Sequence, residues 1–127
     1  MERLAAGAHD AQTEQIILAA LAVHRELGCG FLEVVYRRAF SVELRHAGVP
    51  MQAEARFPIC YKGTNLGVHY RADFVCFGEV IVEVKAHDGL GRADIAQALN
   101  YLKASGLRRA LVINFGRTRL ECRRLAR

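Results

Sequence analysis

The sequence predicts an α/β fold: one domain, residues 1–127, in which a mixed β-sheet is flanked by helices in the order ααβββαββ. Three observations lead to this prediction. Two stretches with helical periodicity begin the chain, three runs rich in β-branched and aromatic residues follow, and a helical stretch precedes two more such runs. A helix between strands allows a right-handed crossover between parallel neighbours, so the sheet is expected to be mixed. Residues 1–10 are a candidate disordered tail.

The two N-terminal helices are predicted from apolar spacing and capping residues. Apolar residues recur at helical intervals over residues 11–27, with Asp10 or Thr13 as the N-cap. A second helix is expected over residues 32–46, where Gly48 can end it in a left-handed conformation. Each helix carries an apolar stripe, so both are expected to pack on the sheet.

Three consecutive strands are predicted in the middle of the chain, over residues 51–61, 66–77 and 80–85. The segment Lys62-Gly63-Thr64-Asn65 has turn composition and separates the first two strands. The second and third strands meet at Gly78-Glu79, which predicts a hairpin.

The C-terminal third is predicted to return to the sheet through a helix. This helix is expected over residues 90–104, with Asp88 as its cap and Gly106 at its end. The continuous apolar run within residues 109–115 is typical of a strand that is covered on both faces. A last strand is expected over residues 118–124.

Charge and apolar content narrow the class of protein. Eighteen basic against 13 acidic residues give a net charge of +5, which favours polyanionic partners such as nucleic acid, although a solvated cationic face is the plainer alternative. The longest apolar stretch, residues 16–23, is too short to span a membrane, so we expect a cytoplasmic protein. Cys29, Cys60, Cys76 and Cys122 lack metal-ligand spacing and are expected to be reduced core thiols.

Charged residues fall inside the predicted hairpin, and their meaning depends on strand register. A two-residue turn at residues 78–79 would put Asp73 and Glu83 on opposite faces of the sheet. A three-residue loop at residues 78–80 would set Asp73 opposite Lys85 and bring both to the same face as Glu83. Both loop lengths are compatible with the sequence.

The second register gathers two carboxylates and an ammonium group, which suits Mg²⁺ or Mn²⁺ with phosphate oxygens as further ligands. Lys85 could then orient the attacking water or stabilise charge on phosphate oxygens. The alternative is a cross-strand ion pair between Asp73 and Lys85, with Glu83 in solvent. Two features favour the site: the third strand is apolar enough to be central, and Gln97 and Tyr101 share one helix face.

These residues occur in an order that resembles a known superfamily. They are Asp73, Glu83-Val84-Lys85, Gln97 and Tyr101. This order resembles the PD-(D/E)XK phosphodiesterases, the restriction-endonuclease-like nucleases. Upstream, GFLEVVY at residues 30–36 resembles the signature of the GxxExxY family within that superfamily, and the likeness extends over about residues 15–124.

The resemblance implies a restriction-endonuclease-like fold and a role for each matching residue. Asp73 and Glu83 would bind a metal ion, with Glu33 as a further carboxylate. Lys85 would be the catalytic lysine. Gln97 and Tyr101 would position phosphate or lysine.

The pattern departs from the family at Cys29, Ala72 and Asp94. Proline is usual at the first two positions. Asp94 stands where a histidine is common, three residues before Gln97, and would change substrate contacts or add negative charge near the phosphate. None of these departures removes an expected metal ligand.

The implied function is metal-dependent hydrolysis of phosphodiester bonds in nucleic acid, with DNA as the expected substrate. The alternative is a module of the same fold that binds nucleic acid or protein without catalysis. Because the domain is small, a homodimer or a partner protein could supply further surface for binding the substrate. The residues expected to contact nucleic acid are Arg37, Arg38, Arg71, Arg92, Arg117 and Arg119.

Overall fold

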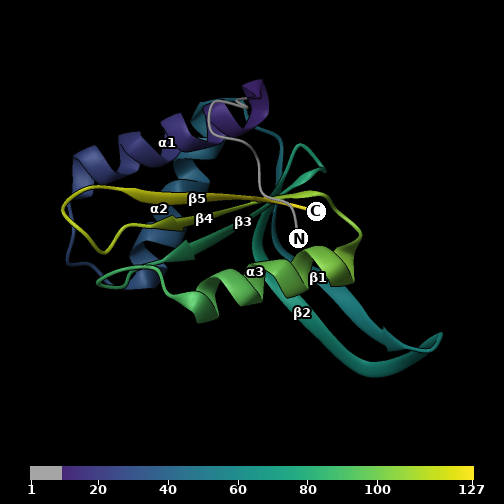
Figure 1. Cartoon of the computed structure of the whole chain (residues 1–127). Helices are drawn as coiled ribbons and strands as arrows, with labels where there is room; N and C mark the ends of the chain where they lie inside the picture. The colour runs from purple at the N-terminus through teal and green to yellow at the C-terminus, as the bar shows by residue number, and fades with distance from the viewer. Residues whose placement is uncertain (1–9) are drawn as a thin grey trace.

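The computed structural model describes residues 10–127 and contains a five-stranded mixed sheet in the order β1-β2-β3-β4-β5. The elements are α1 (Ala11–Leu27), α2 (Glu33–His46), β1 (Met51–Tyr61), β2 (Thr64–Cys76), β3 (Val80–Lys85), α3 (Arg92–Ser105), β4 (Arg109–Asn114) and β5 (Glu121–Ala126). Helices α1 and α2 cover one face of the sheet and α3 covers the other, as Figure 1 shows. The predicted element order and the α/β, restriction-endonuclease-like architecture are confirmed.

The N-terminal helices form where apolar spacing and caps predict them. The Asp10 carboxylate accepts a hydrogen bond of 2.7 Å from the Thr13 N–H, so Asp10 is the N-cap and Thr13 lies inside α1. Asp10 therefore does not belong to the expected tail, whose residues 1–9 lie outside the described part of the chain. Gly48 has a φ of 71° directly after the α2 C-cap, which is the left-handed conformation expected of it.

The start of α3 differs from its prediction. The helix begins at Arg92, with Gly91 as N-cap, and Asp88 does not cap it. Instead the Asp94 carboxylate accepts a hydrogen bond of 2.9 Å from the Gly91 N–H. The Leu90 N–H donates to the Glu121 carboxylate at 3.0 Å, which holds Leu90 in the loop.

Two strand boundaries also move. Lys62 and Gly63 have φ values of 50° and 79° and make a two-residue turn, so β2 already begins at Thr64. The expected four-residue turn was therefore too long. Strand β5 begins at Glu121 instead of residue 118, because Glu121 is the first residue that pairs with β4, opposite Asn114.

Neither expected register of the β2–β3 hairpin is right. Phe74 pairs with Val82 and Cys76 with Val80, so the loop consists of residues 77–79. This register differs by two residues from the one expected with a three-residue loop, and a two-residue shift keeps every side chain on its face. The expected proximity of Asp73 and Glu83 is therefore retained, and each carboxylate accepts a hydrogen bond from the strand that carries the other.

The unexpected loop has a long-range cause. Phe77 adopts a φ of 57°, which is rare outside glycine, and its N–H donates to the Pro50 carbonyl at 2.8 Å. The Glu79 N–H closes the loop on the Cys76 carbonyl at 3.0 Å. The contact with the residue that precedes β1 thus fixes where β3 begins.

Strand β3 is the centre of the sheet. It pairs antiparallel with β2 and parallel with β4, to which it is connected through α3. Buried residues of β3 and β4 face alternately the α1–α2 cluster, as Val82 does, and the α3 cluster, as Ile81 does. A charged residue in β3 therefore has little access to water.

The cysteine prediction holds in part. Cys76 is buried and Cys122 half-buried, and burial raises the pKa of these thiols to about 12 and about 11. Cys29 and Cys60 are exposed, against expectation, because the first lies in the loop before α2 and the second near the end of the projecting β1–β2 hairpin. No helix in the described part of the chain is long and apolar enough to cross a membrane.

Candidate active site

At one end of the β2–β3 pair, hydrogen bonds to side chains replace the hydrogen bonds between the two backbones. Pairing is regular as far as Phe74 and Val82. Beyond it, the Asp73 N–H donates to Glu83 Oε2 at 2.7 Å, and the Val84 N–H donates to Asp73 Oδ2 at 2.8 Å. The two carboxylates thus replace backbone carbonyls as acceptors, which holds both of them where the strands separate.

Burial distinguishes this arrangement from a surface ion pair. Glu83 is only 4% exposed, so the alternative with Glu83 in solvent is wrong. Burial, together with the neighbouring Asp73 carboxylate, raises the pKa of Glu83 to about 8. Burial also raises the pKa of Asp73, against the opposing effects of the Val84 N–H and of Arg37. Ionising both acids is therefore unfavourable even beside Arg37 and Lys85.

The lysine of the motif is held by α3. Lys85 Nζ donates to Gln97 Oε1 at 2.7 Å, and Gln97 Nε2 donates to the Tyr101 hydroxyl oxygen at 3.4 Å. Because residues four apart share one face of a helix, Gln97 and Tyr101 reach β3 together. The structure brings Lys85, Gln97 and Tyr101 into one chain of contacts, at the end of β3 that also carries Glu83.

Tyr101 is a neutral phenol in this setting. Burial and the Glu83 and Asp73 carboxylates raise its pKa, so it keeps its proton at neutral pH. Its ring lies 4.9 Å from the ring of Tyr70 on β2, measured between centroids. A protonated hydroxyl beside two carboxylates can donate a hydrogen bond to an oxygen of a bound anion.

The segment before α2 is held in place by a glycine and by the buried Tyr36. Gly30 has a φ of 113°, which glycine alone adopts without strain. The buried Tyr36 hydroxyl donates to the Gly28 carbonyl at 2.6 Å and accepts from the Phe31 N–H at 3.2 Å, and the Tyr36 ring stacks on Phe115 at 4.9 Å. The glycine and tyrosine of the GFLEVVY segment therefore shape the loop that leads into α2.

Arg37 connects α2 with the carboxylates. Its guanidinium lies 3.5 Å from Glu33 Oε2 and 4.0 Å from Asp73 Oδ1. Glu33 also acts over longer range, since its charge raises the pKa values of Asp73 and Glu83. The structure thus brings Glu33 to the edge of the carboxylate pair, with Arg37 between α2 and β2.

The arginines expected to bind nucleic acid are distributed over several elements. Arg37 lies within the site, and Arg71 forms an exposed ion pair with Glu54 at 3.3 Å. The other four are exposed; they are Arg38 on α2, Arg92 at the start of α3, and Arg117 and Arg119 between β4 and β5. These positions form no single stripe along one helix.

Sequence reasoning assigned no role to Asn114, which is fully buried at the end of β4. Its side chain accepts from the His87 N–H at 2.9 Å and donates to the His87 carbonyl at 3.1 Å and to Glu121 at 3.1 Å. Asn114 therefore holds the loop that follows Lys85. An asparagine at the end of an otherwise apolar strand was the available signal.

His87 is a second residue that the sequence did not single out. Its Nε2 lies 3.2 Å from Asp94 Oδ1. Asp94 is on α3, about one helical turn before Gln97. A Cβ atom on Gly116 would lie 2.3 Å from the His87 carbonyl oxygen, so only glycine permits this close approach. The loop after Lys85 is thus packed against β4 at its backbone while the His87 side chain stays accessible.

The donor set is compatible with one hard divalent cation. Each carboxylate of the pair uses one oxygen for a backbone N–H, and Asp73 Oδ1 and Glu83 Oε1 accept no hydrogen bond within residues 10–127. The same residues contain no group of three or more His, Cys, Asp or Glu side chains arranged to hold a metal ion. Two carboxylates are nevertheless a common protein contribution to a Mg²⁺ site, whose other ligands are water and phosphate oxygens.

The chain matches a family of known proteins. The family model of the PD-(D/E)XK nuclease superfamily matches residues 10–125, which is nearly the full chain. Among curated proteins and among solved structures, no match was found. Nucleases of this superfamily generally use divalent metal ions, and nucleic acid is the substrate class that membership implies. The chain belongs to the PD-(D/E)XK nuclease superfamily.

Proposed function

We propose that the protein is a metal-dependent nuclease that hydrolyses phosphodiester bonds in DNA, and that it belongs to the GxxExxY family within its superfamily. The observation that carries the proposal is the pair of carboxylates on β2 and β3, half-buried Asp73 and buried Glu83, each fixed by a hydrogen bond to the backbone of the other strand. Two adjacent, partly desolvated acids with raised pKa values are costly for stability and are typical of functional sites.

Asp73 and Glu83 are the proposed metal ligands, through the oxygens that make no backbone hydrogen bond. Mg²⁺ or Mn²⁺ at this position would polarise a phosphate oxygen and lower the pKa of a bound water. Glu33, at the edge of the pair, is proposed to contribute a third carboxylate through a water molecule. Arg37 holds Glu33 and partly neutralises Asp73 when no cation is bound.

Lys85 is the proposed catalytic lysine. Gln97 accepts a hydrogen bond from its ammonium group, which holds the ammonium group beside α3. In this position Lys85 can orient the attacking water for in-line attack and stabilise negative charge that develops on the phosphate oxygens. Tyr101, a neutral donor beside the same carboxylates, is proposed to contact the phosphate.

The exposed arginines are proposed to hold the nucleic acid backbone; they are Arg38, Arg71, Arg92, Arg117 and Arg119. Arginine is suited to this task because its planar guanidinium binds phosphate through two parallel hydrogen bonds. Backbone contacts of this kind carry no sequence information, so cleavage by this domain is expected to depend weakly on base sequence.

Cleavage assays test the proposal directly. The full chain is incubated with single-stranded, duplex and branched DNA, and with RNA, in Mg²⁺, in Mn²⁺ and in EDTA. We expect metal-dependent cleavage of DNA that Lys85→Ala reduces by about 100-fold or more. Lys62→Ala, which removes an exposed lysine at the β1–β2 turn, is the matched control and should retain activity.

The remaining outcomes separate the alternatives. Equal cleavage by the native chain and by Lys85→Ala would indicate a contaminating nuclease. Metal-independent binding of DNA without cleavage would instead support the non-catalytic binding module. Preference for RNA would retain the mechanism and change the substrate.

A further inference from the structure

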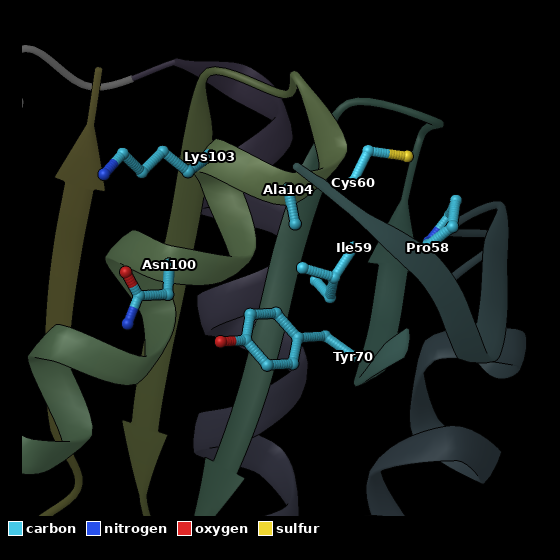
Figure 2. Close-up of a pocket in the computed structure, with 7 residues that line it drawn as sticks. All are labelled: Pro58, Ile59, Cys60, Tyr70, Asn100, Lys103 and Ala104. Carbon is cyan, nitrogen blue, oxygen red and sulfur yellow. The ribbon is translucent and has the colours of Figure 1, made fainter. Parts of the chain in front are cut away.

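Two adjoining cavities lie between α3 and the β1–β2 hairpin. The smaller, of about 350 Å³, begins at Gln97 and Tyr101. The larger, of about 550 Å³, extends along α3 to Lys103 and is bounded on the hairpin side by residues 58–60 (Figure 2). Tyr70 and Asn100 line both cavities, so together they form one groove, which we call the α3 groove.

The α3 groove is continuous with the candidate active site. Gln97, at its inner end, accepts the hydrogen bond from Lys85, and Tyr101 is the residue whose pKa responds to Glu83. Tyr70 follows at 4.9 Å from Tyr101, between ring centroids. A chain bound at the carboxylates can therefore extend from Gln97 into the groove without crossing another element.

The chemistry of the groove fits bases better than the backbone of a duplex. No acidic residue lines either cavity, and one lysine is the only basic residue that does. A duplex backbone is held by many phosphate contacts from several cations. A single strand is instead held by aromatic rings that stack on its bases, by hydrogen bonds to base edges and by occasional phosphate contacts.

The groove has residues for all three kinds of contact. Figure 2 shows the Tyr70 ring between Ile59 of the hairpin and Asn100 of α3. Asn100 is exposed and can donate and accept hydrogen bonds. Lys103, three residues further along α3, extends away from Tyr70 in Figure 2, and its flexible four-carbon chain allows the ammonium group to follow a phosphate.

We propose that the α3 groove binds an unpaired strand of nucleic acid next to the scissile phosphate. Tyr70 stacks on a base, Asn100 contacts a base edge and Lys103 pairs with a phosphate. The substrate class is then nucleic acid that is single-stranded on one side of the cleavage site, such as a free strand, an overhang or a branch. This proposal rests on the nuclease function and specifies its substrate.

Fluorescence anisotropy with labelled oligonucleotides tests the proposal. All variants are made on the Lys85→Ala background in Mg²⁺, so that binding is measured without cleavage. We expect Tyr70→Leu to weaken binding of single-stranded DNA by at least about fivefold while duplex binding changes by less than about twofold. Lys103→Gln should lower the slope of log affinity against log salt for single-stranded DNA by about 0.7.

The turn of the β1–β2 hairpin contains matched controls for the Tyr70 and Lys103 variants. Tyr61 and Lys62 are the same residue types and lie outside both cavities, with Lys62 Nζ 5.5 Å from the centroid of the Tyr61 ring. Tyr61→Leu and Lys62→Gln should leave affinity for single-stranded DNA unchanged. Because Tyr70 packs against the α3 cluster, thermal unfolding of Tyr70→Leu is compared with that of the parent. Asn100→Ala, at an exposed position, tests the groove without this risk and should weaken single-strand binding.

The outcomes for the groove and for the nuclease function are distinct. Unchanged single-strand affinity in Asn100→Ala and Lys103→Gln, alongside Lys85-dependent cleavage by the native chain, would overturn the groove proposal and leave the function intact. Equal losses for single strand and duplex would overturn it as well. Variants that changed the oligomeric state and left DNA affinity unchanged would show that a second copy of the chain occupies the groove. Selective loss of single-strand binding without any cleavage by the native chain would support the groove and reject the nuclease.

Discussion

Asp73 and Glu83 each accept a hydrogen bond from the strand that carries the other, at 2.8 Å from the Val84 N–H and 2.7 Å from the Asp73 N–H. This reciprocal arrangement makes the carboxylates part of the sheet. It also places two acidic groups side by side, one buried and one half-buried, so that ionising both of them is unfavourable. The consequences for stability, metal binding and catalysis can be measured separately.

Removing one charge should stabilise the protein when no metal is present. Glu83→Gln retains an acceptor oxygen for the Asp73 N–H and removes the repulsion with Asp73. We expect its free energy of unfolding in EDTA at pH 8 to rise by about 0.5–2 kcal/mol. Urea denaturation measures the change, and Glu26→Gln, an exposed carboxylate on α1, should have little effect. A less stable Glu83→Gln would show that the negative charge itself supports the strand junction.

The same pair predicts the pH dependence of stability. Unfolded Glu83 ionises near its ordinary pKa of 4.5, and folded Glu83 near 8. Between these values the folded state binds more protons than the unfolded state, so its stability falls as pH rises through this window. Urea denaturation in EDTA at several pH values should show this fall for the native chain and a smaller one for Glu83→Gln. A steeper fall in the variant would assign the effect to other groups.

Metal binding should offset the loss of stability that comes from ionising Glu83 beside Asp73. Mn²⁺ or Mg²⁺ that binds only the folded state raises the melting temperature, with a stabilisation of about 2.7 kcal/mol at a concentration 100 times the Kd. We expect the native chain to show this thermal shift and Asp73→Asn to lose most of it. Lys85→Ala should retain it, because Lys85 is not a proposed ligand. An equal shift in Asp73→Asn would place the metal elsewhere.

Gln97 should affect catalysis through Lys85. Gln97→Leu removes the oxygen that accepts the hydrogen bond from Lys85 Nζ and leaves the remainder of α3 in place. We expect kcat to fall by about 10-fold or more while the metal-induced thermal shift is unchanged. Gln97→Glu retains an acceptor and should recover part of the loss. If Gln97→Leu lowered metal affinity and not kcat, Gln97 would support the carboxylates instead of the lysine.

Asn114 should matter for stability more than an exposed asparagine. Asn114→Ala leaves the N–H and carbonyl groups of His87 without their partner in a part-buried setting. The expected cost is about 1–3 kcal/mol for each unsatisfied group, measured by urea denaturation. Asn65→Ala, which removes an exposed hydrogen bond to the Gly67 N–H, should cost less than about 0.5 kcal/mol. Similar costs for the two variants would mean that water replaces the Asn114 side chain.

The sequence by itself determined the type and order of the helices and strands and the order of the motif residues. Helix α1, its Asp10 cap and the left-handed Gly48 follow from interactions between residues a few positions apart, and such interactions are visible in the sequence. The alternation of apolar and charged residues in β3 likewise placed Glu83 and Lys85 on one face. These local patterns were sufficient to predict a mixed sheet flanked by helices, whereas the carboxylate pair was nominated only with the help of the resemblance to a known superfamily.

Only the tertiary structure decided the features that depend on distant contacts. The hairpin register follows from the hydrogen bond between the Phe77 N–H and the Pro50 carbonyl, and the late start of α3 accompanies the contact between the Leu90 N–H and Glu121. Neither pair of residues is close in sequence, so no local pattern encodes it. The same holds for Asn114, whose partners are brought to it by the parallel pairing of β3 with β4. Local propensity limits the conformations of each segment, and long-range hydrogen bonds in the folded state select among them.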